Sequence, residues 1–127
     1  MKVIEVHGGG FDNLKITERP DPVPGPGEIV VAWHATSLNY HDFLVAAGAI
    51  PVSPGRIPMS DGAGEVVEVG AGVTEWKPGD KVMSLFFPNW IDGKATPAKT
   101  RLISGESIDG YIAEKSRISA QWVTAIP

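Results

Sequence analysis

Prolines and glycines divide this chain into short segments, and that division limits what the chain can fold into. The sequence holds 15 glycines and 11 prolines in 127 residues, and four of the prolines alternate with other residues across positions 20–26. Proline has no amide donor and a fixed φ, so this stretch is excluded from a helix or a central strand. We expect it to be a stiff connection along the surface.

The segments between these breakers carry strand patterns. The strongest is Glu28–Ser37, where β-branched, aromatic and small residues follow one another without a breaker. Its nearly continuous apolar character predicts a strand buried on both faces. Six shorter strands are predicted at residues 1–6, 14–18, 62–70, 81–85, 108–115 and 122–126.

One segment, Asn39–Ala47, changes to a helical period. Apolar residues recur at i, i+3, i+4 and i+7 starting from Tyr40, which predicts a short amphipathic helix. Asn39 is suited to begin it and Gly48 to end it. Residues 86–108 show no clean period and are predicted to be an excursion loop.

These elements together predict a mainly β fold in a single domain. Seven short strands separated by glycine and proline are typical of a barrel or sandwich, here with one helical insertion. Strand and helix units do not alternate often enough for a doubly wound sheet.

Charge and composition exclude several classes of partner and chemistry. The formal net charge is -4 and the pI about 5.3, so no basic field favours nucleic acid or an anionic membrane surface. No apolar window approaches the ~20 residues of a membrane span, and the start lacks a signal-like apolar region. The absence of cysteine excludes disulfides, thiolate zinc sites and cysteine nucleophiles. We expect a cytoplasmic protein.

No glycine motif for phosphate binding is complete. A dinucleotide fingerprint needs G-x-G-x-x-G, but Gly62–Gly64 is followed by Val67 at the third position, and Gly70–Gly72 by Glu75. Gly93–Lys94 lacks the Ser or Thr of a Walker loop. We therefore expect no nucleotide to be held here by the usual backbone cradle.

Four motifs nevertheless resemble, in order, those of the catalytic domain of the medium-chain dehydrogenase/reductase superfamily. They are Asn39–Asp42 before the helix, the glycine-rich signature spacing at Gly64, Gly70 and Val73, the turn Lys77–Val82, and Asp109–Glu114. The resemblance covers essentially the whole chain. It implies that residues 1–127 form a GroES-like, partly open β-barrel with one or two short helices.

The departures from the family pattern concern metal binding. Where zinc-dependent members have a catalytic cysteine this chain has Asn39, and where they have the signature histidine it has Ser60. A catalytic zinc needs three protein ligands, and two are replaced. The four cysteines of the family's structural zinc lobe are also missing from residues 86–108. The chain thus resembles the zinc-free branch, similar to quinone oxidoreductases, and no metal ligands are expected.

Function follows from the resemblance as an expectation. Family members join this domain to a Rossmann domain that binds NAD(P)H, and that domain is absent from these residues. The resemblance implies a zinc-independent NAD(P)-dependent oxidoreductase, a homo-oligomer when full length, that transfers hydride between nicotinamide and a small-molecule carbonyl, alcohol, enone or quinone. The isolated chain is then expected to be inactive. The alternative is a stand-alone GroES-like barrel that acts as a binding or assembly module without catalysis.

The resemblance also implies site residues. Asn39 and Tyr40 face the nicotinamide end of the cofactor, although Asn39 alternatively only caps the helix. His41 takes the place of a hydroxyl that relays the substrate proton and is the catalytic candidate; the alternative is a solvated histidine. Phe86 matches an aromatic wall of the substrate pocket and Trp90 shields the same cleft, unless both serve only in packing.

Two carboxylates match family positions that orient metal ligands. They are Asp42 and Asp61. Without zinc that task disappears, so we expect them to accept hydrogen bonds at the helix N-terminus or in a turn.

Overall fold

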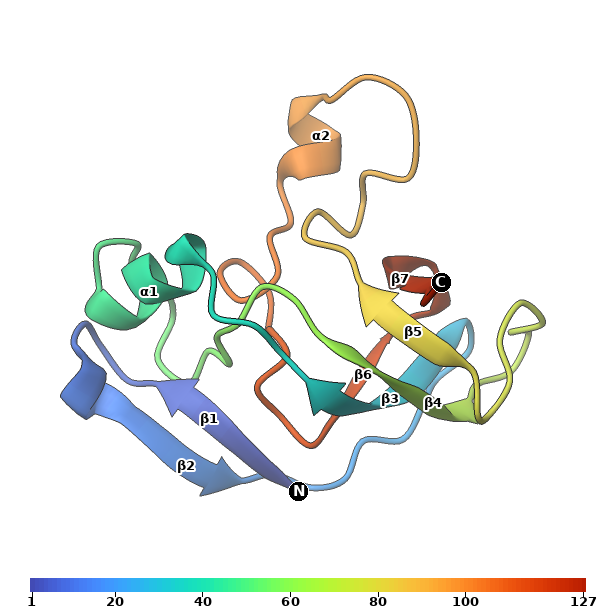
Figure 1. Cartoon of the computed structure of the whole chain (residues 1–127), viewed down its shortest axis with the longest axis horizontal. Coiled ribbons are helices and arrows are strands. Elements are labelled where there is room, and N and C mark those ends of the chain that lie inside the picture. The colour runs from blue at the N-terminus through green and yellow to red at the C-terminus, as the bar shows by residue number, and fades with distance from the viewer.

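Two antiparallel sheets form the framework of the computed structural model, which describes all of residues 1–127 (Figure 1). The smaller sheet pairs β1 (Lys2–Val6) with β2 (Leu14–Glu18) across a glycine turn and a short 3-10 helix, Phe11–Asn13. The larger sheet has the order β6-β3-β4-β5-β7. Its strands are β3 (Glu28–Ala35), β4 (Ala63–Val69), β5 (Lys81–Ser84), β6 (Lys115–Ser119) and β7 (Val123–Ala125). The mainly β prediction is confirmed.

Strand β3 lies between β6 and β4 and carries much of the core. Three consecutive residues, Ile29, Val30 and Val31, are each at most 1% exposed, which confirms burial on both faces for the first half of the strand, whereas His34 and Ala35 at its end are exposed. The strand ends at Ala35, two residues before the predicted end. Beyond it, the amide of Ser37 donates to the carboxylate of Asp61 instead of to a neighbouring strand.

The core lies on one face of the larger sheet. Trp33 of β3 and Tyr111 pack edge to face at its centre, with ring centroids 4.6 Å apart. The buried cluster comprises Ile29, Val31, Trp33, Val66, Val82, Tyr111, Ile118, Ala120 and Val123. Burial of these apolar side chains is the main force that joins the strands.

The proline stretch 20–26 contains no helix or strand, as predicted. Asp21 within it forms ion pairs with Lys115 and with the N-terminal amine of Met1. The stretch therefore connects the two sheets while holding the ends of two strands.

The strand predicted at residues 108–115 is wrong for most of its length, since β6 begins only at Lys115. Gly110 and Tyr111 instead donate their amides to the carbonyls of Ile57 and Met59, at 2.7 and 3.1 Å. A side chain at Gly110 would lie 2.1 Å from the carbonyl oxygen of Met59. The segment is thus hydrogen-bonded to the loop that contains Ile57 and Met59, and it does not extend the sheet.

Helix α1 (Tyr40–Ala47) begins after Asn39 and ends at Gly48, whose φ of 87° suits glycine. The element is as predicted, but its apolar stripe is not the buried face. Tyr40 is 76% and Phe43 44% exposed, whereas Asp42 and two aliphatic residues of the other side are buried. The close approach of Gly48 to Gly9 sets how the helix lies, since a side chain at Gly48 would be 2.4 Å from the Gly9 Cα.

The predicted excursion loop leaves the sheets after β5 and carries α2 (Pro97–Thr100) away from them (Figure 1). The Thr96 side chain accepts a hydrogen bond from the amide of Lys99, which begins this short helix. No helix of the structure is both long enough and apolar enough to cross a membrane.

Candidate functional site

Ser60 and Asp61 of the glycine-rich signature region meet Asn39 of the helix start where β3 ends and β4 begins. Nδ2 of Asn39 donates to Oδ2 of Asp61 at 3.0 Å and to Oγ of Ser60 at 3.3 Å. Ser60 is 2% exposed, so this contact is made at the edge of the interior. We name Asn39, Ser60 and Asp61 the signature cluster.

The carboxylate of Asp61 accepts hydrogen bonds from two residues. It accepts the backbone N–H and the hydroxyl of Ser37, at 3.0 and 2.8 Å, and the side-chain N–H of Asn39. Partial burial raises the pKa of the Asp61 carboxyl, but these hydrogen bonds outweigh it and hold the pKa below its ordinary value. The cluster therefore carries a negative charge at neutral pH, and the prediction that Asp61 accepts hydrogen bonds at the helix N-terminus is confirmed, because its donors are Ser37 and the N-cap residue Asn39.

Asp42 serves the helix start, also as predicted. Its Oδ2 accepts the backbone amide of Asn39 at 2.9 Å, and the residue is 1% exposed. Asn39 thus stands at the N-cap position while its side-chain amide reaches the signature cluster. The two interpretations of Asn39, cap and site residue, are compatible in this geometry.

His41 lies on the first turn of α1, between two loops. Its Nε2 is 2.8 Å from Oε2 of Glu106, and its ring packs edge to face against Phe86 with centroids 5.2 Å apart. The structure therefore brings the predicted catalytic residue and the predicted pocket wall into contact. Glu106 was missed because it is a lone carboxylate in an aperiodic loop, with no spacing that connects it to His41.

The aromatic residues that follow β5 form a row leading away from His41. Phe86 and Phe87 pack edge to face at 4.6 Å, and Phe87 meets Trp90 at 6.1 Å. Trp90 donates its indole N–H to the carbonyl of Gly93 and remains 38% exposed. Trp90 thus reaches Phe86 only through Phe87.

Tyr40 points to a different neighbour. Its ring stacks on Phe43 with centroids 6.2 Å apart and leaves most of its surface exposed. Phe43 in turn contacts Phe11 at 5.5 Å. Tyr40 is therefore next to the signature cluster in sequence but belongs to an exposed aromatic group on α1.

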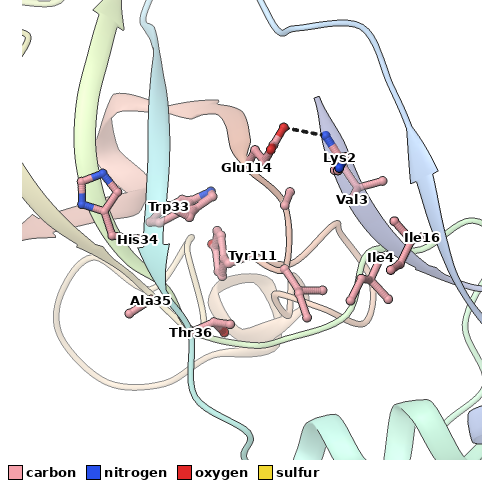
Figure 2. A pocket seen from close by; sticks show the side chains of 12 residues that line it. Lys2, Val3, Ile4, Ile16, Trp33, His34, Ala35, Thr36, Tyr111 and Glu114 are labelled. Atoms are coloured by element: carbon pink, nitrogen blue, oxygen red, sulfur yellow. Dashed lines mark hydrogen bonds between the residues drawn. The ribbon is translucent and has the colours of Figure 1, made fainter.

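Two cavities adjoin the end of β3. One of about 450 Å³ borders the signature cluster and is lined by residues 35–37, 61–63, Met83 and Ser84. The other, of about 350 Å³, lies between β1 and β3, where Figure 2 shows Trp33 and Tyr111 on one side and Val3 and Ile4 on the other. Neither is lined by the predicted residues Asn39, Tyr40, His41, Phe86 and Trp90.

The signature cluster does not fit a zinc ion. Zinc in proteins is held by thiolates, imidazoles and carboxylates. Of these the cluster offers only the carboxylate of Asp61, and the Asn39 side chain presents N–H donors to it. No group of three or more His, Cys, Asp or Glu side chains is placed to hold a metal.

Comparison with known proteins gives the family. Residues 25–127 match the family described as the alcohol dehydrogenase GroES-like domain. The chain belongs to this family. It is 36% identical over 121 residues to a zinc-type alcohol dehydrogenase-like protein of Schizosaccharomyces pombe, covering 93% of the chain and 35% of that protein.

Solved structures agree with this assignment. The GroES-like domain is similar to a thermostable alcohol dehydrogenase from Pyrobaculum aerophilum, with a TM-score of 0.82 and 32% identity over 98% of the chain and 40% of the other. It is also similar to Escherichia coli quinone oxidoreductase complexed with NADPH, with a TM-score of 0.74 and 25% identity over 100% and 33%. The resemblance to medium-chain alcohol dehydrogenases and quinone oxidoreductases is confirmed, and the chain spans about a third of the length of these relatives.

Proposed function

We propose that residues 1–127 are the catalytic-domain part of a zinc-independent, NAD(P)-dependent oxidoreductase. The relatives are oxidoreductases, and the proposed substrate is a small carbonyl, alcohol, enone or quinone. The observation that carries the zinc-independent part is the signature cluster, where hydrogen bonds among Asn39, Ser60 and Asp61 take the place of metal ligands.

The residues at the start of α1 suit the nicotinamide end of the coenzyme. Tyr40 presents a flat, largely exposed ring that stacks on Phe43, and the preceding residue, Asn39, is exposed while its side-chain N–H groups donate to Ser60 and Asp61. An aromatic face and an amide are groups that can hold a planar ring carrying a carboxamide. When bound, the coenzyme supplies or accepts the hydride. The remainder of the coenzyme needs other residues, because the chain has no complete dinucleotide fingerprint.

The side chains around His41 have separate tasks in this proposal. His41 exchanges a proton with the substrate oxygen, as general acid in reduction and general base in oxidation. Phe86 and Trp90, each more than a third exposed, contact the substrate and exclude water from it. Asp61 and Asp42 hold Asn39 through its side chain and its backbone, which fixes the start of α1.

The test measures NADH and NADPH oxidation by the whole protein with a panel of quinones, enones and aldehydes. We expect turnover with at least one class, and a higher KM for the coenzyme in Y40A, whose ring is exposed and whose loss leaves the core intact. We expect none from the 127-residue polypeptide alone. A whole protein that oxidises neither coenzyme with any acceptor contradicts the proposal, and an active 127-residue polypeptide contradicts the assignment of these residues to one part of the enzyme.

We further propose a cytoplasmic protein that is a homo-oligomer when full length. The absence of cysteine supports the compartment. Resemblance to the family supports the oligomer. Cell fractionation and sedimentation of the whole protein test the two points.

A further inference from the structure

The cavity that borders the signature cluster is lined by one charged side chain, and that side chain has no cationic partner. Its volume of about 450 Å³ lies within the range of roughly 300–1,000 Å³ that is usual for small-molecule sites. Among the lining residues only Asp61 is ionisable. None of the ion pairs in the structure includes Asp61, so its negative charge is balanced by hydrogen bonds alone.

The Asp61 carboxylate has room for one more hydrogen-bond donor. An ionised carboxylate offers about four acceptor positions on its two oxygens. Oδ2 accepts both the Ser37 hydroxyl and the side-chain N–H of Asn39, whereas Oδ1 accepts only the backbone N–H of Ser37. The unused acceptor position is therefore on Oδ1.

The two hydroxyls beside Asp61 have already given their hydrogens away. Thr36 donates its hydroxyl hydrogen to the backbone carbonyl of Asp61 at 2.6 Å, and Ser37 donates its own to the Asp61 carboxylate at 2.8 Å. The backbone N–H of Gly62 is likewise used, since it donates to the hydroxyl oxygen of Ser84 at 2.9 Å. A ligand on this side of the cavity therefore meets hydrogen-bond acceptors and a negative charge.

The rest of the cavity suits a hydrocarbon part, and the cavity adjoins the residues that the proposed function assigns to coenzyme and substrate. Strands β3, β4 and β5 each contribute an apolar wall residue: Ala35, Ala63 and Met83. Asp61 is bonded to Asn39, and Ser84 stands two residues before Phe86. A molecule anchored in the cavity thus lies beside both the start of α1 and the aromatic residues after β5.

We propose that this cavity binds the primary ammonium group of a small organic amine, with the ammonium on Asp61 and the hydrocarbon part against the apolar walls. A primary ammonium has three N–H donors, no acceptor and a positive charge, which match a side of the cavity that accepts hydrogen bonds and is negatively charged. A hydroxyl of similar size donates one hydrogen and leaves the charge of Asp61 without a counter-ion. This inference rests on the proposed function for its second part, that the substrate is a small carbonyl compound carrying an amine.

The alternative is that Asp61 only fixes Asn39 and Ser37, and matched ligands and variants separate the two roles. Benzylamine, which is protonated at neutral pH, and benzyl alcohol have nearly the same size and differ in charge. D61N keeps the size of the side chain and removes its charge. E75Q is the matched control, because Glu75 is exposed, has no ion pair and bonds only to the amide of Thr74.

A second pair of variants tests the cavity without changing Asp61. Met83 lines the cavity and is 37% exposed, so a polar side chain at this position reaches water. M83K brings an ammonium of the chain itself to the cavity wall, where it competes with the ligand for the carboxylate. M83Q changes the side chain to a neutral polar one and reports the effect of losing the methionine alone.

The experiment measures the dissociation constants of the whole protein for the two ligands by calorimetry. We expect benzylamine to bind wild type and E75Q at least about tenfold more tightly than benzyl alcohol, the size of effect that a hydrogen bond to a charged group supplies. This preference falls toward unity in D61N, is smaller in M83K than in M83Q, and weakens as salt is added. Thermal unfolding of each variant checks the fold, and the two Met83 variants decide if D61N does not fold.

The substrate part is tested by kcat/KM for para-acetylbenzylamine against para-acetylbenzyl alcohol, and we expect the amine to be preferred. A wild-type protein that binds neither benzyl ligand, or binds both equally, overturns the ammonium site. So does a preference that persists in D61N, or that is equal in M83K and M83Q. An enzyme that turns over neutral carbonyl compounds without preferring the amine overturns the assigned substrate and leaves the proposed function standing. A protein without coenzyme-dependent activity overturns the proposed function, while the binding ratio still decides the ammonium site.

Discussion

The backbone at Met59 gives the sharpest prediction about stability. Met59 has φ of 77°, and it is the one residue other than glycine with a positive φ in the structure. It precedes Ser60 and Asp61 in the signature cluster. The left-handed conformation costs a residue with a Cβ about 1–2 kcal/mol, which glycine avoids.

The surroundings prevent Met59 from relaxing. Its carbonyl accepts the amide of Tyr111 at 3.1 Å, and the backbone of Gly105 and Gly110 presses against it. A side chain at Gly105 would lie 3.0 Å from the Met59 carbonyl carbon. Conformational strain persists where neighbours determine the backbone in this way.

Two substitutions isolate this strain. M59A and M59G both remove the side chain, so the loss of its contacts cancels between them, and only M59G removes the strain. After about 0.5–1 kcal/mol is subtracted for the greater freedom of glycine in the unfolded chain, M59G should be at least as stable as M59A, by a margin of about 0–1.5 kcal/mol. Urea unfolding at equal m-values measures the difference. An M59A variant more stable than M59G by about 0.5–1 kcal/mol, which is the entropy cost of glycine with no strain to offset it, would refute the argument that position 59 is held in the left-handed region.

Three further predictions concern packing and pH. G110A should lower the free energy of unfolding by more than about 2 kcal/mol, because its Cβ would lie 2.1 Å from a backbone oxygen. G72A has open space around its Cβ and should lower it by only about 1 kcal/mol, for its positive φ. Urea unfolding compares the two variants. Because the pKa of Asp61 is lowered in the fold, its carboxylate stabilises the folded state at pH values above the ordinary aspartate pKa, and this stabilisation is lost as pH falls through the folded-state value. The free energy of unfolding of D61N should therefore depend less on pH in the acid range than that of wild type. Burial raises the pKa of Tyr111, although hydrogen bonds with Ser104 and Ser84 oppose this shift. The neutral phenol therefore stabilises the fold below the ordinary tyrosine pKa, and this stabilisation is lost as pH rises through the folded-state value. Absorbance titration of wild type against Y111F should show this phenol ionising late or only with unfolding.

The strands and the helix were predictable because their signals are local. The unbroken run of Glu28–Ser37 and the helical period after Asn39 depend on neighbouring residues, and both elements form close to the predicted bounds. The strand predicted at residues 108–115 was wrong because Gly110 and Tyr111 bond to Ile57 and Met59, in a loop 53 and 52 residues earlier. No local pattern reports such a partner.

The site was predictable in part for the same reason. Motif spacing identified Asn39 and Asp61, whose hydrogen bond the structure shows. The buried face of α1 was not predictable from its own period, because Gly9 and Phe11 decide how the helix lies. The contact between His41 and Glu106 depends on the path of the long loop after β5, which carries no periodic signal.

We propose that the signature cluster works in a nicotinamide-dependent oxidoreductase without zinc. The most direct measurement follows NAD(P)H oxidation by the whole protein before and after treatment with a zinc chelator, together with zinc content by elemental analysis. We expect turnover that the chelator leaves unchanged, and zinc well below one equivalent. Turnover that is lost with the chelator and restored by zinc, or no turnover at all, would contradict it.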